Sequence, residues 1–318
     1  MDNSTKLQHL LPNIDSHLPQ WVDDSKQLCQ YGKVASYIPE LAKGNIDALG
    51  IHMLDAHGNE ASVGDVNTVF TMQSISKVFT LLLALMDNGE EIVFHKVGME
   101  PTGDSFNSML KLELVQPGIP FNPLINAGAI AISSLIQGDS QQHKLERVLQ
   151  FFRKSTQNES LQYNEQVYQS ELQSADLNRS MAYFLKDNGV LEHNVDDVLD
   201  IYFHHCSIDV TCKDLSRMAL ILAYNGMNPI TGEAIVPKRY VQIAKSFMVT
   251  CGMYNASGQF AIQVGLPAKS GVAGGILTLV QGSIGIGIIG PALNSKGNSI
   301  AGVALLEKLS AHYDLSMF

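Results

Sequence analysis

The chain has 318 residues, of which 45% are hydrophobic and only 16% are charged, compared with about a quarter charged in an average domain. Its net charge is −10, from 21 Lys and Arg against 31 Asp and Glu, and the basic residues form no cluster. Nucleic-acid binding is therefore excluded from the expected functions, because contacts with phosphates need concentrated positive charge. The low charged fraction favours a compact enzyme or an oligomer with much of its surface hidden.

The cysteine spacings match neither a disulfide framework nor a zinc motif, and the histidines show no ligand spacing that would indicate a metal site. The cysteines are interpreted as core or free thiols in a reducing compartment: Cys29, Cys206, Cys212 and Cys251. The first residues, Met1 to Lys6, lack the basic and apolar regions of a signal peptide. No apolar run is long enough to span a bilayer. We therefore expect a cytoplasmic protein without a membrane partner.

The N-terminal part of the chain predicts short helices followed by a hairpin. Residues 1–35 are expected to form one or two helices interrupted by Pro12 and Pro19. The run Ile46 to Leu54 is typical of a strand, and a turn at residues 57–59 joins it to a second short strand.

Residues 71–88 predict a helix that is apolar all round over residues 78–86, which is typical of a helix buried between layers. Ser74 and Lys77 stand three positions apart at its start, so the hydroxyl and the amine lie on one face, one turn apart. Ser76 points elsewhere. A lysine whose pKa is lowered by burial can accept the serine proton, and N–H groups of the first turn can stabilise an oxyanion. Such a pattern often occurs by chance, but this setting favours a nucleophile and its base.

The middle of the chain, from about residue 90 to 245, is mostly helical in pattern. Asn194 is a predicted N-cap, and Thr211 with Asp214 predicts a capping box. Three Asn-Gly pairs follow helical patterns and are interpreted as helix C-caps: Asn88-Gly89, Asn188-Gly189 and Asn225-Gly226.

The last part of the chain predicts strands and a final helix. From Gly252 to Gly302, which holds 12 of the 26 glycines, three short apolar runs predict strands: residues 260–264, 276–280 and 283–289. Strands at both chain ends with helices between them predict an α+β fold. We expect an antiparallel sheet lobe of residues 1–75 and 245–318, flanked by helices, an inserted helical lobe of residues 76–244, and the active site between them.

A second motif, Lys269-Ser270-Gly271, precedes a predicted strand far downstream of Ser74. This pair of motifs is the one found in serine β-lactamases and penicillin-binding proteins, so we expect their fold and acyl-transfer chemistry. Their third motif is missing. The one Ser-x-Asn triplet in the relevant stretch, residues 105–107, follows Ser74 too closely and is given no role in proton transfer.

An ordered series of strings from about Tyr37 to Leu306 resembles the serine-dependent glutaminases, a bacterial family whose core is shared with the mitochondrial enzymes. Besides the Ser74–Lys77 motif, the strings are Tyr37-Ile38-Pro39-Glu40-Leu41, Glu100-Pro101-Thr102-Gly103, Phe106-Asn107-Ser108, Asn122-Pro123, Ile125-Asn126-Ala127-Gly128-Ala129, Ser170-Glu171, Asn178-Arg179, Tyr202, Cys206-Ser207 and Lys269-Ser270-Gly271-Val272. Thr102 stands where the family pattern has serine, a departure that bears on no catalytic role.

The resemblance implies hydrolysis of the side-chain amide of L-glutamine to L-glutamate and ammonia. Ser74 would be the nucleophile, Lys77 its base, and Tyr254 a residue that helps to move the proton. Backbone N–H groups of Ser74 and Val272 would form the oxyanion hole. Ser74, Tyr254 and Val272 would contact the substrate, whereas Lys77 is given no substrate contact. The positions that hold the amino-acid end of the substrate would be Tyr37, Asn126, Glu171, Asn178 and Tyr202. No metal or organic cofactor is implied, and a homodimer or homotetramer is expected.

The side-chain types fit a small zwitterion. Glutamine brings an ammonium and a carboxylate, and both must be paired for binding. Glu171 can accept from the ammonium, while asparagine and tyrosine donors can hold the carboxylate and so set the distance to the amide. Two alternatives stay open: a penicillin-recognising acyl-serine hydrolase of the same fold, and a catalytically inactive protein that binds an amino acid.

Overall fold

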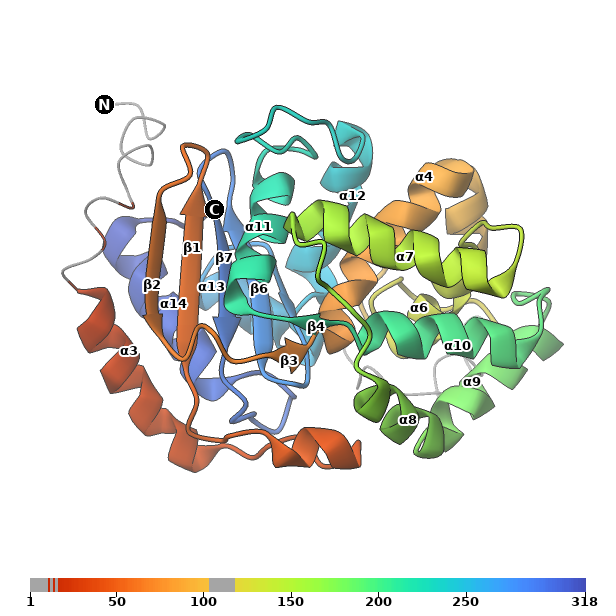
Figure 1. Ribbon diagram of the computed structural model, residues 1–318, viewed down its shortest axis with the longest axis horizontal. Helices are drawn as coiled ribbons and strands as arrows, with labels where there is room; N and C mark the ends of the chain where they lie inside the picture. The colour runs from red at the N-terminus through yellow and green to blue at the C-terminus, as the bar shows by residue number, and fades with distance from the viewer. Residues whose placement is uncertain (1–10, 12–13, 15–16, 103–117) are drawn as a thin grey trace.

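The computed structural model describes residues 11, 14, 17–102 and 118–318, so the Ser-x-Asn triplet at 105–107 and Pro12 lie outside the described residues. A five-stranded antiparallel sheet stands on one side of the molecule and a group of helices on the other (Figure 1). The sheet has the order β2-β1-β7-β6-β5. Its strands are β1 (Gly50–Asp55), β2 (Glu60–Gly64), β5 (Ala268–Ser270), β6 (Gly275–Val280) and β7 (Ile284–Ile289).

The pairing of β1 with β7 joins the two ends of the chain in this sheet, with Ile51 opposite Ile288 and Met53 opposite Ile286. The predicted α+β class, the first hairpin and the strands at 276–280 and 283–289 are therefore confirmed. A separate short pair, β3 (Phe70–Thr71) with β4 (Asp209–Val210), lies next to the start of the central helix.

The helices bear out most of the predicted pattern. Their bounds are α3 (Leu18–Lys26), α4 (Ser76–Lys96), α6 (Asn126–Ser134), α7 (Gln141–Thr156), α8 (Glu165–Gln173), α9 (Asp176–Asp187), α10 (Val195–Cys206), α11 (Cys212–Ala223), α12 (Lys238–Cys251), α13 (Ser257–Gln263) and α14 (Ile300–Tyr313). Short 3₁₀ turns cover Gln27–Tyr31, Pro39–Lys43, Gln73–Ile75 and Tyr254–Ala256. The Asn194 cap and the Thr211–Asp214 capping box are both present. Gly89, Gly189 and Gly226 all have the left-handed φ expected of helix ends.

The predicted strand at residues 260–264 is wrong, because most of this run lies in α13. Phe260 is 4% exposed and Ile262 is 88% exposed. Side chains two positions apart share one face of a strand, whereas on a helix they point in different directions. A short apolar run carries too little periodicity to distinguish the two.

Two smaller expectations also need correction. Pro19 does not interrupt a helix but stands in the first turn of α3, where its missing N–H costs no hydrogen bond. The helix predicted from residue 71 begins as a 3₁₀ turn, with α4 starting at Ser76, and it continues past the break at Gly89 to Lys96.

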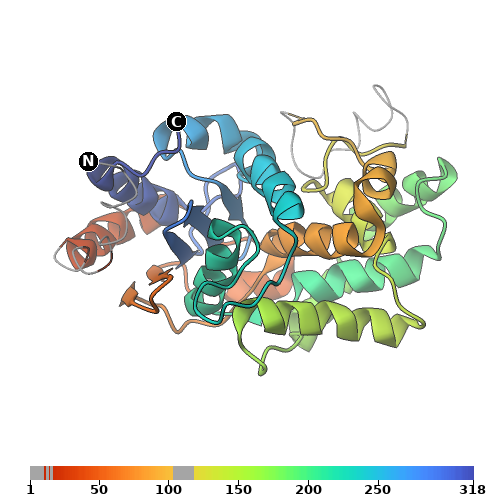
Figure 2. The ribbon, with the colours of Figure 1, turned by 90° about the horizontal axis from the view of Figure 1, so that it is seen from above.

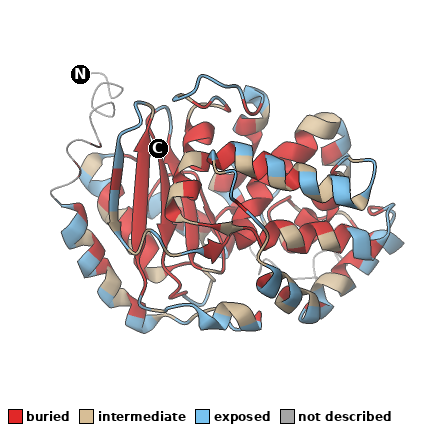
Figure 3. Ribbon diagram, viewed as in Figure 1, coloured by how far each residue is buried: buried red, intermediate tan, exposed pale blue. Residues whose placement is uncertain are grey.

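Helices cover both faces of the sheet (Figure 2). On one face, leucines of α14 pack in one cluster with Ile51 of β1 and with Ile286 and Ile288 of β7, and α3 joins them. On the other face α11 contacts β1, β6 and β7. Figure 3 shows that β1, β6, β7 and the central helices are largely buried, whereas the edge strand β2 and the outer helix faces are mostly exposed.

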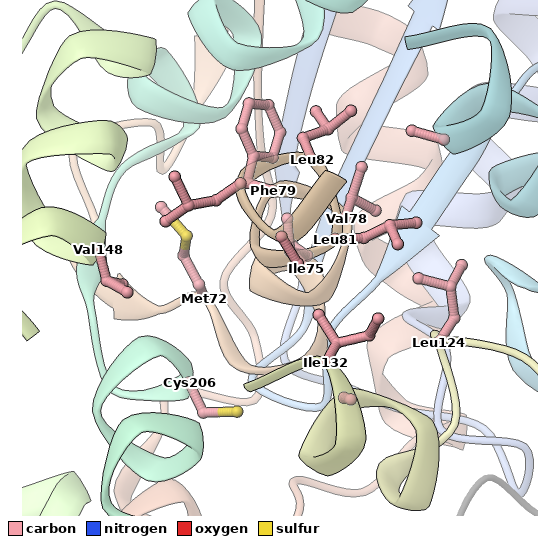
Figure 4. Close-up of a cluster of buried hydrophobic side chains, with 14 of the residues drawn as sticks. Met72, Ile75, Val78, Phe79, Leu81, Leu82, Leu124, Ile132, Val148 and Cys206 are labelled. Atoms are coloured by element: carbon pink, nitrogen blue, oxygen red, sulfur yellow. The ribbon is translucent and has the colours of Figure 1, made fainter. Parts of the chain in front are cut away.

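The central helix α4 is enclosed from its start, since residues 71–85 are all buried. Met72, Ile75 and Phe79 lie in one hydrophobic cluster with residues of α6, α7 and α10 (Figure 4). All four cysteines are buried and free, as their spacing predicted. In the part of the chain that the structure describes, no helix combines the length and the apolar character needed to cross a membrane.

We predict that Gly287→Ala lowers the free energy of unfolding by about 3 kcal/mol, because α11 packs directly on β7. A Cβ at Gly287 would lie 2.1 Å from the carbonyl oxygen of Cys212. Gly258→Ala in α13 is the matched control, since a Cβ there meets nothing within 4 Å, and it should change stability by less than about 1 kcal/mol. Urea denaturation measures both. Equal stabilities of the two variants would contradict the close approach of α11 and β7.

Candidate active site

Ser74 and Lys77 are three positions apart in sequence, and both are buried where the chain enters α4. Ser74 belongs to the 3₁₀ turn that precedes the helix, and Lys77 is the second residue of α4. Lys77 is 1% exposed. Its Nζ donates to Asn126 Oδ1 at 2.6 Å and to the carbonyl oxygen of Leu124 at 3.4 Å. Both of these acceptors are neutral oxygens.

The buried environment changes the protonation of Lys77. Burial lowers the pKa of its amine to about 8, although Cys206 and the carboxylate of Glu171 act in the opposite direction. An amine with this pKa is present in its neutral form to a useful extent near neutral pH. The structure therefore offers a base one helical turn from a buried serine.

A pocket opens at Ser74 and gathers residues from five further parts of the chain. Six of the predicted site residues line it: Tyr37, Ser74, Asn126, Glu171, Asn178 and Tyr202. Asn126 opens α6, Glu171 lies on α8, Asn178 on α9 and Tyr202 on α10. Helix packing therefore brings together side chains that are widely separated in sequence.

Glu171 supplies a buried carboxylate to this pocket. Gln73 Nε2 donates to Glu171 Oε1 at 2.7 Å. Burial raises the pKa of Glu171 to about 7, and the Gln73 hydrogen bond and the charge on Lys77 partly oppose that shift. Across the pocket, Asn126 Nδ2 donates to Asn178 Oδ1 at 3.1 Å. A buried carboxylate with a raised pKa is stabilised when a cation is placed beside it.

The remaining two predicted residues, Tyr254 and Val272, are not among those that line this pocket. Burial raises the pKa of the Tyr254 hydroxyl, and a hydrogen bond with Ser74 opposes this shift. The same hydroxyl donates to the carbonyl oxygen of Ser270 at 3.0 Å. Val272 packs with Tyr254 and Leu293 in a small cluster. Tyr254 is therefore linked to Ser74 directly, and Val272 is next to Tyr254.

The Lys269-Ser270-Gly271 segment lies against the chain that leads into Ser74. A Cβ at Gly271 would be 2.6 Å from the carbonyl oxygen of Met72. Only glycine allows this approach without a shift of the backbone, which explains the glycine of the motif. The end of β5 and the turn before α4 are thus held in contact.

Sequence reasoning missed two residues of the site. Gln73 is buried and has a φ of 50°, in the left-handed region that a residue with a side chain rarely adopts. Its only signal in the sequence is its place before Ser74. Lys269 was given no role in the predicted site, although it is the first residue of the Lys269-Ser270-Gly271 motif. It is fully buried, its Nζ lies 4.3 Å from the Tyr254 ring centre, and burial lowers its pKa well below the ordinary value, with the charge on Lys77 adding to the shift.

Within the described residues, no group of three or more His, Cys, Asp or Glu side chains is arranged to hold a metal ion. His204 and His205 belong to separate clusters, His204 beside Asp200 and His205 beside Ser76. The groups at the site are a buried serine hydroxyl, a buried carboxylate and a buried amine whose pKa is lowered.

Comparison with known proteins places the chain in a family. A family model described as glutaminase matches residues 32–318. A glutaminase from Alkaliphilus metalliredigens (strain QYMF) is 55% identical over 305 residues, which cover 96% of this chain and 100% of that protein. A glutaminase from Geobacillus thermodenitrificans (strain NG80-2) is 53% identical over 301 residues, covering 95% of this chain and 97% of that protein.

A solved structure is similar over the same length. It is the covalent complex between a Bacillus subtilis glutaminase and 5-oxo-L-norleucine, formed by reaction with 6-diazo-5-oxo-L-norleucine. It matches with a TM-score of 0.88 at 40% identity and covers 96% of this chain and 100% of that chain. The family match spans every residue assigned above to the site, from Tyr37 to Val272. The chain therefore belongs to the glutaminase family.

Proposed function

We propose that this protein hydrolyses the side-chain amide of L-glutamine to L-glutamate and ammonia through an acyl-enzyme at Ser74. The observation that carries the proposal is a buried Ser74, in the pocket that also holds Glu171, three residues before a buried Lys77 whose pKa burial lowers to about 8. Membership of the glutaminase family supports the choice of substrate. The covalent complex of the related Bacillus subtilis glutaminase supports a nucleophilic mechanism.

In the first half of the reaction, neutral Lys77 takes the proton of the Ser74 hydroxyl as Ser74 Oγ attacks the amide carbon. Tyr254, which is hydrogen-bonded to Ser74, helps to pass the proton. The oxyanion that forms accepts hydrogen bonds from the backbone N–H groups of Ser74 and Val272. The C–N bond then breaks, the proton goes to the leaving nitrogen, and ammonia departs from the ester at Ser74.

In the second half, water attacks the ester while Lys77 takes its proton. The bond between the acyl carbon and Ser74 Oγ breaks, the proton returns to Ser74, and glutamate leaves. One glutamine and one water thus give one glutamate and one ammonia. Each half of the reaction begins with a neutral lysine as the proton acceptor, so a low pKa of Lys77 is the main requirement.

Glu171 is proposed to bind the α-ammonium of glutamine, because a buried carboxylate gains most from a cationic partner. Asn126, Asn178, Tyr37 and Tyr202 are proposed to hold the α-carboxylate through neutral donors. With both ends held, the amide carbon lies at a set distance from Ser74. Asparagine, one methylene shorter, would place its amide away from the nucleophile.

We also propose the arrangement of the serine β-lactamases for the fold, with a sheet lobe of residues 1–75 and 245–318 and a helical lobe of residues 76–244. A pocket that combines Tyr37 and Ser74 with Asn126 and Glu171 supports a site between these lobes. Four free cysteines fit a cytoplasmic location. A homodimer or homotetramer is proposed from the low charged fraction, and light scattering would test it.

The first test is the release of ammonia from glutamine. We expect release by the wild type and none by Ser74→Ala, because no other group would form the acyl-enzyme. Ser134→Ala is a matched control, since this buried hydroxyl only donates to the Ala131 carbonyl at 2.7 Å. No release by the wild type would favour an inactive binding protein. Covalent labelling of Ser74 by a fluorescent β-lactam, without release of ammonia, would favour the penicillin-recognising alternative.

The second prediction concerns pH. Because Lys77 acts as a base only when neutral, kcat should rise with pH and reach half its maximum near the pKa of about 8. It should level off about one pH unit higher, where most of the amine has lost its proton. Lys77→Met should lower kcat by at least about a thousandfold and keep the fold. Stopped-time ammonia assays across pH measure the profile. Normal turnover by Lys77→Met would remove this residue from the mechanism.

The third prediction concerns Glu171, whose pKa burial raises to about 7. Below this pH the carboxyl group is neutral and cannot pair with the ammonium, so the KM for glutamine should rise as the pH falls. Glu171→Gln should raise KM by about a hundredfold and remove this pH dependence. Glu165→Gln, an exposed position on the same helix, is the control. A KM that is unchanged in Glu171→Gln would exclude the ammonium contact.

A further inference from the structure

One fully buried histidine has no task in the proposed mechanism. His205, on α10, is 0% exposed. Its Nδ1 lies 2.7 Å from Ser76 Oγ, and its Nε2 lies 3.2 Å from Ser133 Oγ. Burial lowers the pKa of the ring to about 3, and the charge on Lys77 adds to this effect. The ring is therefore neutral at physiological pH and carries one proton.

Ser76 connects this ring to the backbone just before the nucleophile. Its hydroxyl donates to the carbonyl oxygen of Gln73 at 2.7 Å, and its backbone N–H bonds the same oxygen. A hydroxyl has one proton to give, and Ser133 gives its own to the carbonyl oxygen of Ala129 at 2.8 Å. Both serines can therefore accept from the ring, which has a single N–H. We assign that N–H to Nδ1, because the contact with Ser76 is the shorter of the two, 2.7 Å against 3.2 Å. The hydrogen bonds run in one direction, from His205 through Ser76 to Gln73.

The carbonyl of Gln73 and the N–H of Ser74 belong to the same peptide group. Any rotation of that peptide group changes the direction in which the Ser74 N–H points. In addition, a hydrogen bond to the Gln73 carbonyl makes the Ser74 N–H a stronger donor. Gln73 needs such restraint, because its φ of 50° is sparsely populated and persists only where surrounding contacts hold it. The side chain of Gln73 is held by Glu171, and its carbonyl is held by Ser76.

We propose that Ser76 and His205 are positioning residues for glutamine hydrolysis, which hold and polarise the Gln73–Ser74 peptide group so that its N–H stabilises the oxyanion. Neither side chain is among those that line the pocket, so both act through this peptide. The inference rests on the proposed function, because it takes the Ser74 N–H as an oxyanion donor. The inference explains what holds the Ser74 N–H in the orientation that the oxyanion needs.

The decisive variant is Ser76→Ala, which removes the hydroxyl at the start of a helix where alanine is well tolerated. Ser216→Ala is a closely matched control. Ser216 is also fully buried, its hydroxyl donates to the carbonyl three residues earlier, that of Lys213, at 2.9 Å, and it lies 2.7 Å from the Nδ1 of another buried histidine, His52. It lies on α11 against the sheet and has no contact with Gln73.

We expect Ser76→Ala to lower kcat for glutamine by about tenfold, equivalent to about 1.4 kcal/mol, with KM changed by less than about twofold. Ser216→Ala should keep the wild-type kcat and lose a similar amount of thermal stability. Active sites are counted by covalent labelling with 6-diazo-5-oxo-L-norleucine, so that kcat refers to folded enzyme. A split between kcat and KM is expected because the oxyanion forms only after substrate has bound.

Variants of His205 test the inference independently of Ser76→Ala. His205→Asn keeps an N–H donor where Nδ1 stood and should retain most of the activity, whereas His205→Leu removes it and should match Ser76→Ala. The double variant Ser76→Ala/His205→Leu should be no slower than either single variant, because both break one chain of hydrogen bonds. If His205→Leu does not fold, the Ser76 comparison decides alone.

Two results would overturn the inference. One is a kcat of Ser76→Ala within about twofold of the Ser216→Ala value. The other is a KM that rises as much as kcat falls, which would mean general distortion of the pocket. Failure of the proposed function would give a different result. The wild type would then release no ammonia from glutamine, and there would be no kcat to compare between Ser76→Ala and Ser216→Ala.

Discussion

The Lys77 amine lies in the interior of the protein, where burial lowers its pKa to about 8, and the rest of the site depends on this one desolvation. A buried ammonium costs several kcal/mol unless it is paired. Its hydrogen-bond acceptors, Asn126 Oδ1 and the Leu124 carbonyl, are neutral. A carboxylate in contact with the amine would keep the proton on it, so the neutral acceptors preserve its capacity to act as a base.

The packing that excludes water from Lys77 also builds the pocket. Helix α4 is surrounded by α6, α7, α10 and α12. Two of these neighbours carry pocket residues, Asn126 at the start of α6 and Tyr202 on α10. Desolvation of the base and placement of the substrate contacts are therefore consequences of the same helix packing. Loss of one would disturb the other, because a dense core transmits shifts between neighbouring side chains.

Backbone strain is concentrated next to Ser74. Among the described residues, five that are not glycine have a left-handed φ, and three of them, Gln157, Asn225 and Asp314, lie at helix ends where this conformation is common. The other two are Gln73, which precedes Ser74, and Tyr254, which is hydrogen-bonded to it. Strain of this kind is maintained only by surrounding contacts, and it is typical of catalytic sites.

Features that rest on near neighbours in the chain could be predicted from the sequence alone. The one-turn spacing of Ser74 and Lys77, the capping box at Thr211 and the strand at 276–280 all follow from local geometry. The ordered motifs also indicated the glutaminase family and six of the residues that line the pocket. The run at 260–264 was mistaken for a strand, because its composition suits both structures and its burial is decided by distant residues.

Only the tertiary structure decided the charges and contacts within the site. Gln73 and Glu171 are 98 positions apart and share a hydrogen bond, and Ser76 and His205 are 129 positions apart. The lowered pKa of Lys77 likewise depends on helices that the chain supplies much later. Sequence spacing determined which side chains share a face, because that geometry is set within one helical turn. Desolvation and long-range hydrogen bonds were decided by the tertiary structure, because they depend on which distant segments pack against that face.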